Sequence, residues 1–196
     1  MTEPIKLTKS LRQLMETTEY LILEKGCKKT TLQDIIRHSG LSKGAIYHYV
    51  RSKEELYGLI LRNHSVNVDD SFFKQASKET AGLDEPLSAI VSHLDYLTDK
   101  DDVRNIIFIY LLGLKDNPVI IELLSNIYEA SLKNAISWVE TGQKAGVIKS
   151  ELDPQSTAKM FMSFSYGLRL RGMLEEEDIS HEINDFYNLM KNTLQT

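Results

Sequence analysis

The sequence predicts an all-α fold of about nine helices. Apolar residues recur at spacings of three and four, which places them on one face of a helix. Helix start and stop signals, such as a capping residue ahead of a proline or a closing glycine, separate these segments. No stretch alternates polar and apolar residues between hairpin turns, as a paired strand would. With 196 residues, the chain is long enough to bury a substantial core.

The first predicted helix covers about residues 7–25 and ends at Gly26. Its apolar positions have helical spacing, and glycine readily adopts the left-handed conformation that closes a helix. A second helix is expected to begin near Thr30 or Thr31, because Thr30 and Gln33 have the spacing of a capping box.

Gly40 is expected to end the second helix, and Ser42 can cap a short third helix of residues 43–49. Ser52 can cap a long helix that reaches about residue 77. Asp84, Asn117 and Asp153 give the later start signals, each closely followed by a proline. The further helices are predicted at residues 85–98, 102–115, 117–145, 153–175 and 179–194.

Residues 30–57 predict two short helices hinged at a glycine, with the start of a third. This is the helix-turn-helix arrangement, which places its second helix in the major groove of DNA. Small residues at the start of that helix allow close approach to DNA, and its polar side chains can donate hydrogen bonds to phosphates or bases. The small residues are Ser42, Gly44 and Ala45, and the donors are Lys43, Tyr47, His48 and Tyr49. The same spacing also fits an amphipathic helix pair with no link to DNA.

The charge of the chain is distributed unevenly. Lys and Arg outnumber acids ten to five in residues 1–53, which gives this part +5. Because the whole chain carries −5, the remainder carries −10. A basic N-terminal part on an acidic body fits a head that binds DNA, although chance clustering of surface charge would give the same count.

The run LSKGAIYHYVRSKEELY, preceded by TTLQDII, resembles the N-terminal DNA-binding signature of the TetR (tetracycline repressor) family of bacterial transcription regulators. Two positions depart from the family pattern, which usually has Ala at Ile36 and often Phe at Val50. Both are expected to face inward. The resemblance implies that phosphates are held by Thr31, Tyr47 and Lys53, and that the groove is faced by Ser42, Lys43, Gly44, Ala45, His48 and Tyr49.

The resemblance also implies a helix-turn-helix domain of residues 1–51 and a body of residues 52–196 that binds an effector and dimerises. From the residues alone, the bulky side chains of the body are more simply explained as core. By resemblance they line a pocket for a small apolar or aromatic molecule. The expected lining is His93, Tyr96, Arg104, Phe108, Tyr110, Tyr128 and Trp138.

The last two long helices carry an apolar stripe together with Gly167 and Gly172. Glycine inside a helix is costly, but it lets another backbone approach closely. That approach can come from a second copy of the chain or from the same chain. The resemblance favours a homodimer, and hence a palindromic operator. The expected interface is Phe164, Gly167, Leu168, Arg171, Phe186 and Met190.

Other function classes find little support. The sequence lacks a phosphate-binding loop, a nucleophile motif and a zinc-protease motif, so no catalytic residue, metal site or cofactor is expected. Its single cysteine, Cys27, and the lack of a long apolar run or signal sequence favour the cytoplasm over a membrane. We therefore expect a ligand-responsive dimeric repressor. The alternative is an architectural or coactivator protein of the same fold that no small molecule controls.

Overall fold

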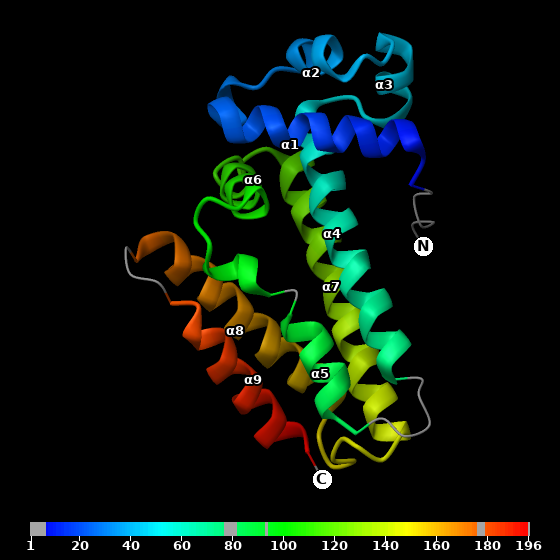
Figure 1. The fold of residues 1–196 in the computed structure, drawn as a ribbon, viewed down its shortest axis with the longest axis vertical. Helices are drawn as coiled ribbons and strands as arrows, with labels where there is room; N and C mark the ends of the chain where they lie inside the picture. Colours follow the sequence, from blue (N-terminus) through cyan, green and yellow to red (C-terminus); the bar gives the residue numbers. More distant parts are fainter. Residues whose placement is uncertain (1–6, 77–81, 93, 176–178, 196) are drawn as a thin grey trace.

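The computed structural model describes residues 7–76, 82–92, 94–175 and 179–195. Within these ranges the chain forms nine α-helices and one 3-10 helix, and its only β-type pairing is an isolated bridge between Ile148 and Gln195 (Figure 1). The all-α prediction is confirmed. The elements are α1 (Lys9–Lys29), α2 (Leu32–Ser39), α3 (Lys43–Tyr49), α4 (Lys53–Ala76), α5 (Asp84–Val91), η1 (Asp95–Thr98), α6 (Val103–Leu112), α7 (Pro118–Lys144), α8 (Pro154–Leu174) and α9 (His181–Leu194).

Helices α1, α2 and α3 form the head. Gly26, with φ of 78°, interrupts α1 near its end, and Gly40, with φ of 66°, ends α2 as predicted. The capping box at the start of α2 joins Thr31 to Asp34, so the predicted pairing of Thr30 with Gln33 is wrong. Thr30 is buried instead, and its hydroxyl donates to carbonyl oxygens of α1.

Of the three capping residues predicted shortly before a proline, two are confirmed. Asn117 and Asp153 cap α7 and α8 with their side chains, directly ahead of the prolines. Asp84 does not cap α5, since its carboxylate binds Lys191 and Tyr187 of α9. The helix expected over 85–98 is also wrong, because α5 ends at Val91 and a 3-10 turn follows.

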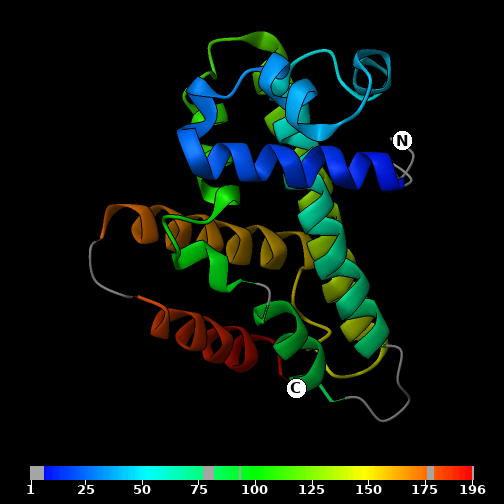
Figure 2. The same ribbon diagram turned by 45° about the horizontal axis from the view of Figure 1, so that its top comes forward.

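The body is built on two long helices. α4 and α7 lie side by side and both run away from the head, whereas α8 and α9 lie beside them and run in opposite directions (Figures 1 and 2). One hydrophobic core joins the head to the first turns of α4 and to α6, and a second joins α5, α8 and α9. Packing is therefore continuous across the predicted domain boundary after residue 51.

The head is fixed to the body at the start of α4. The ammonium of Lys53 donates to the carbonyl oxygens of Cys27, Thr30 and Lys28, at 2.8, 2.9 and 3.3 Å. The Tyr57 hydroxyl donates to the Cys27 carbonyl as well, at 3.1 Å. These carbonyls lie where α1 ends, so a cation there satisfies groups that the helix leaves unpaired.

Helix α6 completes this junction. The hydroxyl of Tyr110 donates to the Glu54 carboxylate at 3.0 Å, and the Lys53 ammonium lies 5.2 Å from the centre of the Tyr110 ring. Burial and the nearby Glu54 carboxylate raise the pKa of Tyr110 to about 12. The phenol therefore stays protonated at neutral pH and keeps its hydrogen bond to Glu54.

Replacing Lys53 with Met should lower the free energy of unfolding by about 1–3 kcal/mol, because the carbonyls at the end of α1 lose a charged donor. Urea denaturation followed by circular dichroism measures this. The matched control is Lys43→Met, since Lys43 is exposed and its ammonium, among the residues that the structure describes, bonds no carbonyl and lies over the Tyr47 ring. An equal loss in both variants would contradict the role given to Lys53.

Gly172 is required by packing inside the chain. A Cβ atom there would lie 2.7 Å from the Leu97 carbonyl oxygen and 2.7 Å from the Thr98 Cα, both in η1. Gly172→Ala should therefore lower the free energy of unfolding by about 1–3 kcal/mol. Gly44→Ala is the control, because nothing lies within 4 Å of its added Cβ. Similar melting curves for the two variants would show that η1 can move aside.

Candidate nucleic-acid interface and body cavity

Helix α3 presents a polar face to solvent. Ser42 caps the helix by accepting a hydrogen bond from the Ala45 amide, and Ile46 is fully buried beneath it. Tyr47 is 46% exposed, so its side chain is accessible to a partner. The outward side chains are those of Ser42, Lys43, Tyr47 and His48, and Gly44 is exposed beside them.

The other residues predicted to contact DNA differ in how far burial and bonds within the protein occupy their side chains. Thr31 is exposed, but its hydroxyl is shared with Asp34 in the capping box. Tyr49 is half-buried, and its hydroxyl lies 2.8 Å from the Thr8 hydroxyl at the start of α1. Ala45 is also half-buried. Lys53 lies at the junction with three carbonyl partners, so its ammonium is not turned outward to meet a phosphate as we expected.

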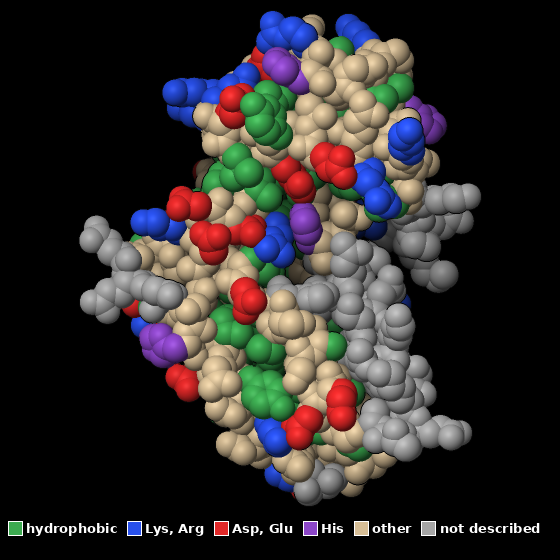
Figure 3. Space-filling model, viewed as in Figure 1, with side chains coloured by type: hydrophobic (Ala, Val, Ile, Leu, Met, Phe, Trp, Pro, Cys, Tyr) green, Lys and Arg blue, Asp and Glu red, His purple; other side chains and the backbone are tan. Residues whose placement is uncertain are grey.

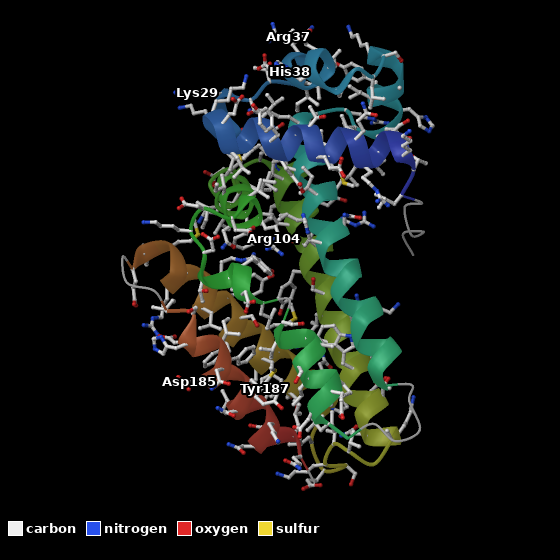
Figure 4. The ribbon with its side chains drawn as sticks, in the orientation of Figure 1. Lys29, Arg37, His38, Arg104, Asp185 and Tyr187 are labelled. Carbon is white, nitrogen blue, oxygen red and sulfur yellow. The ribbon has the colours of Figure 1, made fainter. Side chains whose placement is uncertain are left out.

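A second group of basic side chains lies at the outer end of the head. Lys29, Arg37 and His38 stand at its edge, on α1 and α2 (Figure 4). Hydrogen bonds from Lys25 and then from Thr31 hold the pKa of the Asp34 carboxyl well below its usual range, so an anion stays at the start of α2. Motif matching missed these residues, and the charge count included only Lys29 and Arg37.

The body contains a cavity of about 230 Å³ that is partly open at its surface. Four of the seven predicted residues line it, namely Tyr96, Arg104, Phe108 and Trp138. Arg104 lies at the middle of the body, where Asp102 binds its guanidinium with two hydrogen bonds (Figure 4).

The other three predicted residues do not line it. The prediction is wrong for Tyr110, because its side chain points toward Glu54 and the head. Tyr128 is absent from the lining too, and its ring lies 6.3 Å from that of Tyr166. His93 lies outside the described residues. Arg169 and Tyr166 of α8 do line the cavity, and no local sequence pattern pointed to either.

The expected dimer residues fall into two groups. Phe164, Gly167 and Arg171 are exposed on one face of α8. Leu168, Phe186 and Met190 are buried inside the protomer at 2%, 1% and 4% exposure, so the expectation that they meet a partner is wrong for these side chains. They pack in the body core, where Phe186 and Met190 also line the cavity.

The exposed face of α8 extends beyond the predicted residues. Met160 and Leu174 lie on the same helical stripe as Phe164 and Gly167, and they are 47% and 73% exposed. Nothing lies within 4 Å of a Cβ placed on Gly167, so the glycine leaves an open notch in this stripe. The two glycines of α8 thus have different surroundings, since only Gly172 meets its own chain.

The two signs of charge are unevenly distributed over the surface. On the face shown in Figure 3, Lys and Arg side chains stand along the outer edge of the head, while acidic side chains are spread over the body. The described residues hold no group of His, Cys, Asp or Glu able to bind a metal ion. Among the helices of the described chain, none is long and apolar enough to cross a membrane.

Known proteins share both the head motif and the fold. A sequence profile described as "Bacterial regulatory proteins, tetR family" matches residues 14–60. The transcriptional repressor KstR2 of Rhodococcus jostii is 31% identical over 137 residues. That match covers 62% of this chain and 65% of the repressor, just under two thirds of its length.

Two solved structures extend the likeness to the whole chain. A TetR-family regulator from Syntrophomonas wolfei has a TM-score of 0.74 at 18% identity and covers 94% of each chain. The regulator FadR of Bacillus subtilis, solved with stearoyl-CoA, has a TM-score of 0.69 at 19% identity and covers 93% of this chain and 98% of its own. At such identities the likeness establishes the fold.

The relatives are named as transcriptional regulators or repressors, which are not enzymes, and they confirm the prediction that the chain is not one. Residues 14–60 therefore match the TetR-family profile, and the described chain has the fold of TetR-family regulators.

Proposed function

We propose that this chain is a dimeric repressor that binds a palindromic operator through α3 and leaves it when a small, largely apolar molecule occupies the body cavity. The observation that carries the proposal is the outward face of α3, with Lys43, Tyr47 and His48 exposed above a buried Ile46. A repressor of this family acts on chromosomal DNA, so we place it in the cytoplasm.

Two helices link the cavity to the head. α4 carries Lys53 and Tyr57 at the junction and lines the cavity with Leu61 and His64. α6 carries Phe108 on the cavity side and Tyr110 on the junction side. A ligand that displaces either helix would move the head. Occupancy would then favour one of two dimer arrangements, with the heads spaced wrongly for the operator.

The alternative is an architectural or coactivator protein that no small molecule controls. The cavity favours the ligand-responsive repressor, because an unregulated bundle gains stability from filling such a space. A selection of bound duplexes from a random DNA pool, followed by gel shifts with the selected sequence, tests the DNA function. Recovery of no enriched sequence would reject the operator proposal.

Tyr47→Ala should weaken binding to every duplex and flatten the salt dependence of binding, because one phosphate contact is lost. Gel-shift titrations with the selected duplex and with a scrambled one measure the change. Changes at Lys43 should instead alter sequence preference. Tyr20→Ala serves as a control, since Tyr20 is 58% exposed and lies on α1, away from α3. Unchanged affinity in Tyr47→Ala would remove this contact from the interface.

Phe164→Glu should convert the proposed dimer to a monomer, because a carboxylate would enter the exposed stripe of α8. Sedimentation at micromolar concentration measures the mass. Val119→Glu is the matched control, as Val119 is 57% exposed but lies at the start of α7. A wild-type chain that sediments as a monomer, or a Phe164→Glu variant that stays dimeric, would reject this interface.

A further inference from the structure

The cavity wall is largely apolar, and the side chains in it that can carry a charge at neutral pH are all basic. Three lining residues can carry a positive charge, namely His64, Arg104 and Arg169, and no Asp or Glu is among the lining residues described. Cations facing a cavity of this kind are costly unless an anion pairs with them.

Two of the three cationic groups already have a carboxylate partner. The His64 imidazole lies 3.0 Å from the Glu19 carboxylate, and the Arg104 guanidinium lies 2.6 Å from that of Asp102. Arg169 has no carboxylate within ion-pair distance among the side chains that the structure describes. Arg169 is therefore the lining cation that lacks a counter-ion there.

The surroundings of Arg169 hold it in place without neutralising it. One of its terminal nitrogens donates to the Tyr96 hydroxyl at 2.8 Å, while its Nε is buried with no hydrogen-bond partner in the described structure. Its guanidinium lies 4.4 Å from the ring centre of Phe108 and 5.3 Å from that of Tyr96. Aromatic faces attract a cation, but they supply no acceptor in the guanidinium plane.

We propose that the effector is an amphipathic anion, whose apolar body fills the cavity and whose carboxylate or similar acidic group binds Arg169. This rests on the proposed function, because it takes the cavity to be the effector site. A carboxylate matches the fork of N–H donors on a guanidinium, and it supplies the missing counter-ion. Quaternary ammonium ligands are disfavoured, because the protein's own guanidinium already occupies the aromatic faces.

The single tryptophan of the chain gives a direct readout. Trp138 lines the cavity, so its emission reports on occupancy without a label. Purified full chain is titrated with decanoate, decan-1-ol and decyltrimethylammonium, which share one apolar chain and differ in head group. All three are kept below their micellar concentrations. Decanoate should bind about 10- to 100-fold more tightly than decanol, the range for one charged hydrogen-bonded pair, and decyltrimethylammonium should bind weakest.

Variants of Arg169 test whether this side chain causes the preference for decanoate over decanol. Arg169→Met should bring decanoate to the affinity of decanol, and Arg169→Lys should retain part of the preference. Lys159→Met is the matched control, because Lys159 lies on the same helix but is exposed and is not among the residues that line the cavity. This control should keep the full preference for decanoate.

The outcomes separate this inference from the proposed function. Equal affinities of decanoate and decanol for the wild type, an unchanged preference in Arg169→Met, or binding of none of the three probes would overturn the anionic class. Gel shifts with the selected duplex test the repressor separately. If decanol releases that DNA as well as decanoate does, control by the cavity stands while the role of Arg169 fails.

Discussion

The ammonium of Lys53, held by the carbonyl oxygens at the end of α1, determines how the head sits on the body. A helix leaves its last carbonyls unpaired, and burying them without a donor would be costly. Here the donor comes from the first residue of α4, with Tyr57 one turn later. The hydrogen bonds that satisfy the end of α1 therefore also set the orientation of α4. The hydrogen bond between Tyr110 and Glu54 sets the orientation of α6 in the same way.

Local signals predicted the elements well because capping and turn chemistry act within a few residues. Gly40, Ser42 and the Asn117-Pro118 pair end or begin helices where expected. The error at Asp84 has the opposite cause. Its carboxylate is used by Lys191 and Tyr187, more than a hundred residues away, and such a partner cannot be seen in a local pattern.

The candidate sites show the same limit. The outward face of α3 could be predicted because every residue of it lies in one short motif. The cavity could be predicted only in part, since its wall combines side chains from α4 to α9. Arg169 illustrates this, because a lone arginine on a long helix usually faces solvent, and only the fold brings it to Tyr96 and Phe108. Leu168 was misassigned because an apolar stripe alone does not show which of its residues pack in the core of the same chain and which face outward.

The distance between the junction and the cavity bears on how the two communicate. Lys53 and His64 are on one helix, and at 1.5 Å per residue the eleven steps between them span about 16 Å. Between them lies Gly58, where a Cβ would meet the Leu123 side chain of α7 at 2.6 Å. Leu123 of α7 therefore packs against the bare backbone of α4 at that glycine. A ligand pressing on Leu61 or His64 acts beyond this contact, whereas Lys53 lies before it. In the proposed mechanism, α4 tilts about the contact at Gly58, and the tilt carries α1 and the rest of the head with it.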